Sequence, residues 1–206
     1  MRTIGSGDRG AARQMLISSP QLATARLVGG ASRAEAQHYF LESFGVYLYA
    51  GHTCLHVAAA AYDTELARAL VDAGADVRAK NRRKAEPIHE AVTGQPGSPS
   101  WDPARQATVI GYLLDAGADP EALAAGGVTP LHRAVRNRCT AAVRVLLDAG
   151  ADPQRPNDSG STAATLARLT TGRSGSGSDA AHAEQAAIIA ILDAAIDEAT
   201  GGSGSP

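Results

Sequence analysis

Two histidines and a cysteine stand at alternate positions in the first third of the chain, in a pattern typical of metal ligands. His52, Cys54 and His56 give the sequence H-x-C-x-H. Zinc requires three or four ligands that converge on one point. His56, however, also belongs to a motif that recurs further along the chain, and that motif gives it a structural role. We therefore predict no metal at this pattern.

A glycine-rich segment lies near the end of the chain, directly before a predicted helix. Residues 171–178 read TGRSGSGS, and free backbone amides at a helix start can bind anions. The segment contains no GxxxxGK[ST] motif and no strand leads into it, so it does not match a phosphate-binding loop. Behind it, Asp179 and His182 offer a carboxylate and a base one helical turn apart, and Glu184 follows. The chain shows no Ser-His-Asp order, no paired carboxylates and no nucleophile elbow, so we assign no catalytic residue and no cofactor.

The cysteines and the apolar segments bear on the compartment. Cys54 and Cys139 are the only cysteines, too few for a disulfide scaffold. The first apolar cluster, at 15–17, is too short for a signal-peptide core, and no window approaches the roughly 18 apolar residues of a membrane helix. We therefore expect reduced thiols, no membrane segment and a cytoplasmic location.

The composition favours an all-helical protein. Of the 206 residues, 44% are hydrophobic but only 4% are aromatic, and alanine is abundant. Because strands favour β-branched and aromatic side chains, a β-sandwich or barrel is disfavoured. The net charge of −2 gives no global reason to expect nucleic acid. Arginine greatly outnumbers lysine, which together with the alanine and glycine content favours a bacterial source.

Two short motifs recur in phase along the chain. The sequence LVDAGAD at 70–76 returns as LLDAGAD at 113–119 and at 146–152, with spacings of 43 and 33 residues. A second motif ends in a histidine at His56, His89 and His132, with spacings of 33 and 43 residues. The period is therefore 33 residues, with ten extra residues inside the second copy. A period of this length indicates stacked repeats.

These motifs resemble the ankyrin repeat family. The third copy is the clearest, with GVTPLHRAV at 127–135 followed by LLDAGAD at 146–152. The resemblance covers residues 50–156, and a degenerate fourth copy extends it to about 196. It implies an all-α ankyrin-repeat solenoid of helix-turn-helix-loop units. It also implies that the histidine of each motif ties adjacent loops together.

The motif residues make physical sense as one such unit. Thr129 supplies a cap oxygen, and Pro130 fits the first turn of a helix. Leucine and alanine then share one helical face, and a second helix carries valine and leucine at helical spacing, as in Val143, Leu146 and Leu147. Gly150 ends that helix as a left-handed C-cap. Cys54 and Glu86 depart from the pattern, since the first replaces the motif's proline and the second its threonine.

The repeats divide the chain into three parts. We predict an N-terminal helical cap at 1–50, repeats at 51–198 and a flexible tail at 199–206. The expected units are 51–81, 82–122 with an insertion near 94–106, 123–157, and a degenerate capping repeat at 158–198 with an insertion near 171–182.

The N-terminal cap is expected to contain helices at about 8–17 and 33–44. Five aromatic residues crowd into its second half: Tyr39, Phe40, Phe44, Tyr47 and Tyr49. They either plug the open end of the first repeat or form a binding platform.

Most of the residues that we predict to bind a partner are basic. Ankyrin-like repeats generally bind proteins through loop tips and the inner, first-helix face. We therefore predict a non-catalytic interaction module, of adaptor or immunity-inhibitor type, whose partner is a protein with an acidic surface. The predicted partner-binding residues are Arg78, Lys80, Arg82, Arg83, Lys84, Arg133, Arg136, Tyr62 and Trp101. Trp101 either forms a binding hot spot or folds back on its own insertion.

An alternative function remains open at the two insertions. Both fall at the same place in their units, so they would form a cleft for a small-molecule binder or an enzyme, with Trp101, Arg173 and His182. Nucleic acid is not expected, because aromatic residues are not interleaved with the basic ones. We expect a monomer.

Overall fold

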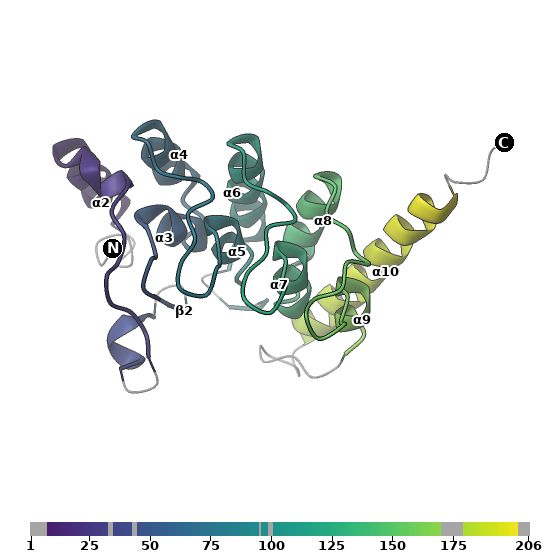
Figure 1. The fold of residues 1–206 in the computed structure, drawn as a ribbon. Helices are drawn as coiled ribbons and strands as arrows, with labels where there is room; N and C mark the ends of the chain where they lie inside the picture. The colour runs from purple at the N-terminus through teal and green to yellow at the C-terminus, as the bar shows by residue number, and fades with distance from the viewer. Residues whose placement is uncertain are drawn as a thin grey trace.

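The fold is a row of helix pairs that stack side by side (Figure 1). The structure, a computed structural model, describes residues 8–32, 35–42, 45–94, 96–98, 101–169 and 179–201. The first helices of the pairs are α3 (Cys54–Ala60), α5 (Pro87–Ala91), α7 (Pro130–Arg136) and α9 (Ala163–Ala167). The second helices are α4 (Thr64–Asp72), α6 (Pro103–Asp115), α8 (Thr140–Asp148) and α10 (Asp179–Gly201).

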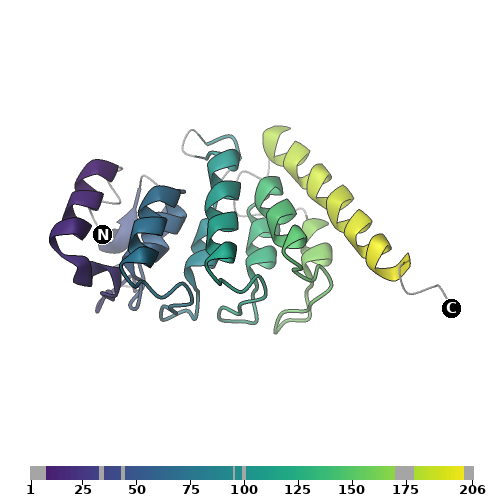
Figure 2. The same ribbon diagram turned by 90° about the horizontal axis from the view of Figure 1, so that it is seen from above.

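The first helices form one layer and the second helices form another. In the first layer α3 contacts α5, α5 contacts α7 and α7 contacts α9, while in the second α4 contacts α6, α6 contacts α8 and α8 contacts α10. The loops that follow α4, α6 and α8 project from the same side of the stack (Figure 2). The all-α repeat fold expected from the sequence is therefore confirmed.

The core lies between the two layers and is built from leucine, isoleucine and alanine. Small side chains let the first helices approach closely, since Ala58, Ala59, Ala91 and Ala134 are fully buried. The largest fully buried apolar side chains come from both layers and from every pair: Leu55, Leu66, Leu70, Ile88, Ile110, Leu113, Leu131, Leu146, Ile188 and Leu192. A single pair buries its apolar faces only against its neighbours, so the stack is stabilised as a whole.

A buried histidine links each of the first three units to the next. The Nδ1 atom of His56 accepts a hydrogen bond from the backbone N–H of Thr53, which fixes the proton on Nε2. The Nε2 atom lies 3.1 Å from the carbonyl oxygen of Ala85 in the second unit. His89 and His132 repeat this contact on the carbonyls of Val128 and Ser161, at 3.1 and 3.0 Å. The structural role expected for the motif histidine is confirmed.

The helix ends follow the motif residues. Thr129 Oγ1 accepts a hydrogen bond from the backbone N–H of His132 and so caps α7. Gly150, at the end of α8, has φ +87°, a left-handed conformation that suits glycine. Local sequence therefore sets both ends of the third unit.

The N-terminal segment differs from its prediction in one part. Helix α2 (Arg9–Ser18) lies where a helix was expected and contacts α4, and a 3-10 turn, η1 (Pro20–Ala23), follows it. The helix predicted at 33–44 is wrong: the chain forms η2 (Gln37–Tyr39) and then a hairpin of β1 (Phe40–Leu41) and β2 (Val46–Tyr47). The rings of Phe40 and Tyr47 pair across the hairpin at 4.7 Å, a contact that a helix cannot make. Phe44 lies outside the described residues.

Two further boundaries differ from the sequence prediction. Helix α6 begins at Pro103 and α10 at Asp179, so each second helix starts inside the expected insertion. Helix α10 also runs on to Gly201, so residues 199–201 are helical rather than part of a flexible tail. The remaining residues of the expected tail, 202–206, lie outside the described part of the chain.

The buried histidines predict how stability depends on pH. Burial lowers the pKa of His56 and of His89 to about 4, from an ordinary value of 6.5. The unfolded chain therefore binds more protons than the folded one between pH 6.5 and pH 4, and the free energy of unfolding falls as pH falls through this range. We expect a loss on the order of 3 kcal/mol for each histidine between pH 7 and pH 4, measured by urea unfolding.

A pair of variants separates this effect from general acid sensitivity. His89→Gln removes one buried titrating group and is expected to flatten the pH dependence, whereas His182→Gln, on the exposed start of α10, leaves it unchanged. Equal stability of the wild type at pH 7 and pH 5 would contradict the neutral, buried histidines.

Candidate partner-binding groove

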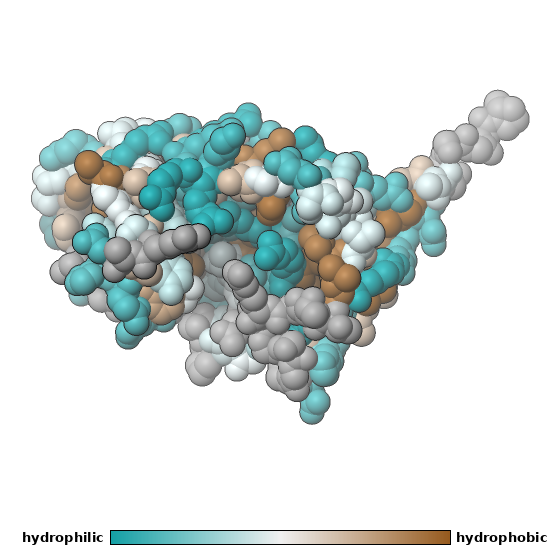
Figure 3. Space-filling model, turned by 60° about the horizontal axis from the view of Figure 1, so that its bottom comes forward, coloured by the Kyte–Doolittle hydropathy of each residue, from teal (hydrophilic) through white to brown (hydrophobic). Residues whose placement is uncertain are grey.

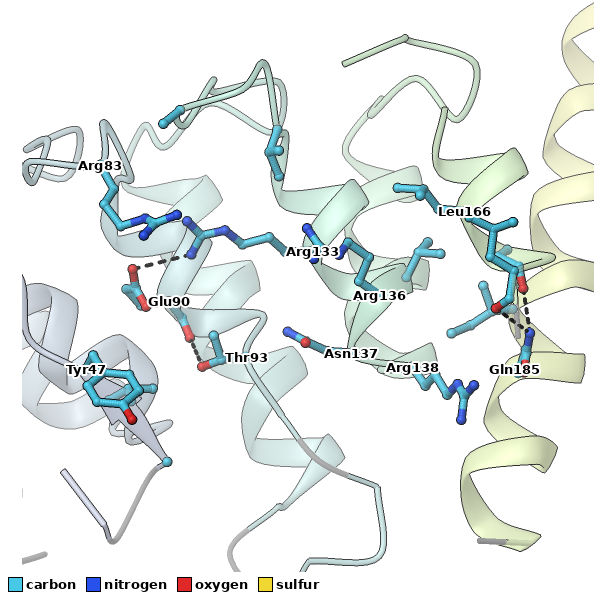
Figure 4. A pocket seen from close by; sticks show the side chains of 18 of the residues that line it. Tyr47, Arg83, Glu90, Thr93, Arg133, Arg136, Asn137, Arg138, Leu166 and Gln185 are labelled. Carbon is cyan, nitrogen blue, oxygen red and sulfur yellow. Dashed lines mark hydrogen bonds and ion pairs between the residues drawn. The ribbon is translucent and has the colours of Figure 1, made fainter. Parts of the chain in front are cut away.

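A groove of about 620 Å³ runs along the first-helix layer. The residues that line it come from β2, from the loops before α5 and α7, from the first helices α5, α7 and α9, and from α10. They include Tyr47, Tyr49, Arg83, Glu90, Thr93, Val128, Arg133, Arg136, Asn137, Arg138, Leu166, Leu169, Gln185 and Ile188 (Figure 4). The groove therefore joins residues that lie up to 140 positions apart and exists only in the stacked fold.

Arginine dominates the charge of the groove. Four arginines and one carboxylate, Glu90, line it in the described part of the chain. Glu90 is engaged, since its Oε1 lies 3.4 Å from Nη1 of Arg133 and 3.7 Å from Nε2 of His52. Burial opposes the charged form of Glu90, but its contacts with His52 and with the charge of Arg133 outweigh it and hold its pKa at about 2. Glu90 therefore neutralises Arg133 and leaves Arg83, Arg136 and Arg138 as the excess charge.

Two tyrosines form the wall of the groove at its N-terminal end. The guanidinium of Arg83 lies 5.2 Å from the ring centroid of Tyr49, a distance suited to a cation–π contact. Tyr47 packs on Phe40 and remains 40% exposed. Tyr47 and Tyr49 thus line the groove, while Tyr39 packs against the core.

The opposite end of the groove is more apolar. Leu166 and Leu169 follow one another around the end of α9, and Ile188 faces them from α10. Hydrophilic residues cover much of this side of the molecule, and a hydrophobic patch lies close to α9 and α10 (Figure 3). The groove therefore offers positive charge along its length and apolar surface at one end.

The predicted basic residues divide into two groups in the structure. Arg83, Arg133 and Arg136 line the groove together. Arg78 and Lys80 do not: the Nη2 atom of Arg78 lies 3.0 Å from Asp119 Oδ2, and Nζ of Lys80 lies 3.6 Å from Glu86 Oε1.

The other two basic loop residues also lie outside the groove lining. Arg82 donates from Nη2 to the carbonyl oxygen of Ala31, 2.7 Å away, and so fastens the N-terminal segment to the loop. Lys84 is exposed beside this loop. Of the basic residues predicted to bind a partner, Arg83, Arg133 and Arg136 therefore line the groove, and Arg78, Lys80, Arg82 and Lys84 do not.

Tyr62 is buried, so its predicted role as a partner contact is corrected. It is only 6% exposed, and its hydroxyl donates a hydrogen bond to the carbonyl oxygen of Thr93. Trp101 is half-buried and donates from Nε1 to Oε1 of Gln106, 3.2 Å away. Gln106 in turn donates to the Tyr62 hydroxyl at 3.3 Å. These hydrogen bonds hold the first insertion against the core. Of the two alternatives predicted for Trp101, the structure shows the one in which it folds back on its own insertion.

The cleft considered between the two insertions is not the groove. Arg173 lies outside the described residues, and neither Trp101 nor His182 lines the groove. The two insertions do meet, because a Cβ atom placed on Gly97 would lie 3.9 Å from the Cβ of Ala180 at the start of α10. The geometry that the structure describes thus brings these segments together without joining them to the arginines.

The remaining chemical candidates are structural. Both ring nitrogens of His56 are hydrogen-bonded, and within the described ranges no three histidine, cysteine or acidic side chains are grouped to hold a metal ion. Cys54 and Cys139 are both free and buried. Burial raises the pKa of Cys139 to about 12, so this thiol is not activated as a nucleophile.

Sequence reasoning missed several groove residues. Glu90, Asn137 and Gln185 carry no motif, and their roles depend on contacts between units. The position of Arg138 could have indicated that it lines the groove, since it lies two residues after the helix that supplies Arg133 and Arg136. Among the helices of the described residues, none is both long and apolar enough to cross a bilayer.

Comparison with known families agrees with the fold. A model described as ankyrin repeat matches residues 50–82, and one described as ankyrin repeats (many copies) matches residues 113–167. These two matches support an ankyrin repeat family for the repeat region of the chain. A search of curated proteins found no significant match.

Glu86 gives a test of the local charge pattern. It stands before α5 where Thr53, Thr129 and Thr162 stand in the other units, and it is fully buried with neither carboxylate oxygen hydrogen-bonded in the described chain. Burial raises the pKa of Glu86, against the charges of Arg78 and Lys80. We expect Glu86→Thr to raise the free energy of unfolding by about 1 kcal/mol, because threonine caps the helix and no carboxylate is buried.

Chemical denaturation of the variant at pH 7 measures this change. Thr129→Glu is the matched control, since it places the same carboxylate before α7 and is expected to destabilise the protein. A Glu86→Thr variant less stable than the wild type would show that the ion pairs with Arg78 and Lys80 stabilise the fold.

Proposed function

We propose that this chain is a non-catalytic protein-binding module of adaptor or inhibitor type, which holds an acidic segment of a partner protein in the groove. Ankyrin repeats are generally protein–protein interaction modules. The observation that carries the proposal is the excess of arginine in a groove on an otherwise slightly acidic protein, whose net charge is −2. Positive charge gathered in one concave place selects partners of opposite charge and speeds their association.

The groove also has the residue types that stabilise protein interfaces. Tyrosine and arginine are enriched among residues that contribute most to binding. Tyr47 and Tyr49 line one end, where the exposed Arg83 lies over the ring of Tyr49, and the exposed Arg136 lines the groove further along (Figure 4). Because Glu90 holds Arg133 in place, part of the groove is organised before a partner arrives.

The two ends of the stack support a monomeric module. Helix α2 contacts α4 at one end, and the long helix α10 contacts α8 and α9 at the other. The first pair is thus covered by an element of the chain itself, and the last pair ends in α10, which is longer than the other second helices. We place this monomer in the cytoplasm, where its free, buried thiols would stay reduced.

Charge reversal in the groove tests the proposal. The full chain is immobilised and used to capture proteins from a lysate of the organism that encodes it, at low and high salt, with quantification by mass spectrometry. The wild type is expected to capture an acidic protein at low salt. The variant Arg83→Glu/Arg136→Glu is expected to capture at least tenfold less, because both exposed groove cations now repel it.

Arg144→Glu is the matched control. Arg144 is exposed on α8, in the second-helix layer and outside the groove. The substitution Arg144→Glu therefore makes the net charge more negative, as the double variant does, without changing a residue of the groove. Equal capture by the wild type and the double variant would refute binding through the groove, and loss of capture in Arg144→Glu would reduce the effect to net charge alone.

A further inference from the structure

The geometry points to a carboxylate-binding subsite around Arg138, at the α10 end of the groove, which receives an acidic side chain of the partner that lies next to an apolar one. This inference rests on the proposed function, since it names the chemistry that one part of the groove would recognise. No motif in the sequence indicates this subsite.

Arg138 is buried and lacks a partner for part of its guanidinium. The residue is 4% exposed, and its Nη1 atom has no hydrogen-bond partner in the part of the chain that the structure describes. It lines the groove and lies between α7 and α10 (Figure 4). A buried charge without a counterion costs far more than an exposed one, so an arginine in this state is poised to gain from an anion.

Three other arginines of the C-terminal half show what Arg138 lacks. Arg133 pairs with Glu90, Arg155 with Glu121 and Arg168 with Asp193. Each of these is more exposed than Arg138, yet each has a carboxylate. No carboxylate of the described residues forms an ion pair with Arg138, so the missing partner is one that another molecule can supply.

The first unit contains an internal comparison for this position. Tyr62 and Arg138 both follow a first helix and both hold a positive φ, +52° and +58°. Both side chains are large and buried. Tyr62 satisfies its hydroxyl on the carbonyl of Thr93, whereas the Nη1 of Arg138 is left over. The turn itself therefore does not require an unpartnered group.

The surroundings of Arg138 favour a carboxylate beside an apolar side chain. The side-chain amide of Asn137 donates to the carbonyl oxygen of Val92. The side-chain amide of Gln185 donates to the carbonyl oxygens of Ala167 and Leu169. Arg138 is thus the donor that remains at this end, with the exposed Arg136 beside it.

The walls of the subsite are apolar. Leu169 is 55% exposed, Leu166 is half-buried, and the buried Ile188 lies behind them. One buried guanidinium fits a singly charged carboxylate, whereas a phosphoryl group calls for more donors.

Defined peptides test the subsite on the full chain. The probe is a fluorescein-labelled peptide of sequence Gly-Ser-Leu-Glu-Leu-Ser-Gly, and its sister peptides carry glutamine or phosphoserine in place of glutamate. Fluorescence anisotropy at low salt is expected to show at least tenfold tighter binding of the glutamate peptide than of the glutamine peptide. Arg138→Met is expected to abolish this difference, and the exposed Arg144→Met is expected to keep it.

Thermal unfolding without peptide supplies a second readout. Because Arg138→Met removes a buried and unpartnered charge, its melting temperature is expected to equal or exceed that of the wild type. A purely structural role for Arg138 would instead lower the melting temperature. Glutamate peptide that binds the wild type no better than glutamine peptide, or no binding at all, overturns the subsite, as does unchanged discrimination in Arg138→Met. Tighter binding of the phosphoserine peptide overturns the assignment to a carboxylate.

The two proposals fail in different ways. If partner capture is lost in Arg83→Glu/Arg136→Glu but is unchanged in Arg138→Met, the groove binds the partner and the subsite is wrong. If capture is unchanged in both variants, the groove itself is not the binding surface.

Discussion

The hydrogen bond from a buried histidine to the backbone of the next unit fixes the register of the whole stack. Each ring accepts from the backbone just before its own helix and donates to a carbonyl 29 or 39 residues further along. Both ring nitrogens are therefore used, and a protonated ring would lose the first of these bonds. With the register fixed, the alanine faces of the inner helices meet and the loops project in parallel. This alignment brings Arg83 from one unit beside Arg133 and Arg136 from the next, and without it the groove would not exist.

The positive charge of the groove depends on which basic side chains lack an acidic partner, and less on how many basic side chains the chain has. Arg78 and Lys80 are neutralised by Asp119 and by Glu86, and Glu90 neutralises Arg133. The charge left over lies on the inner face, where apolar and aromatic side chains flank it. A slightly acidic protein can therefore carry a basic binding surface, and such a surface attracts acidic partners while the rest of the protein repels them.

The sequence predicted the repeats well because their signals are local and recur. The cap at Thr129, the turn at Gly150 and the motif histidines each depend on a few neighbouring residues. The hairpin at 40–47 was missed because it depends on pairing of Phe40 with Tyr47 across a turn, and a helical pattern fits the same residues. The site was predicted in part: Arg83, Arg133 and Arg136 were identified, but the burial of Tyr62 and of Arg138 depends on Gln106, Thr93 and α10, which reach them only in the folded chain. Charge counting along the loop likewise could not foresee that Glu86 would be buried between Arg78 and Lys80.

Hydrogen–deuterium exchange of the chain with and without a captured partner tests the central claim most directly. Binding in the groove predicts slower exchange of backbone amides in the loop at 81–86, in α7 and in α9, with little change in α4, α6 and α8. Slower exchange confined to the second-helix layer, with the groove segments unchanged, would contradict the account.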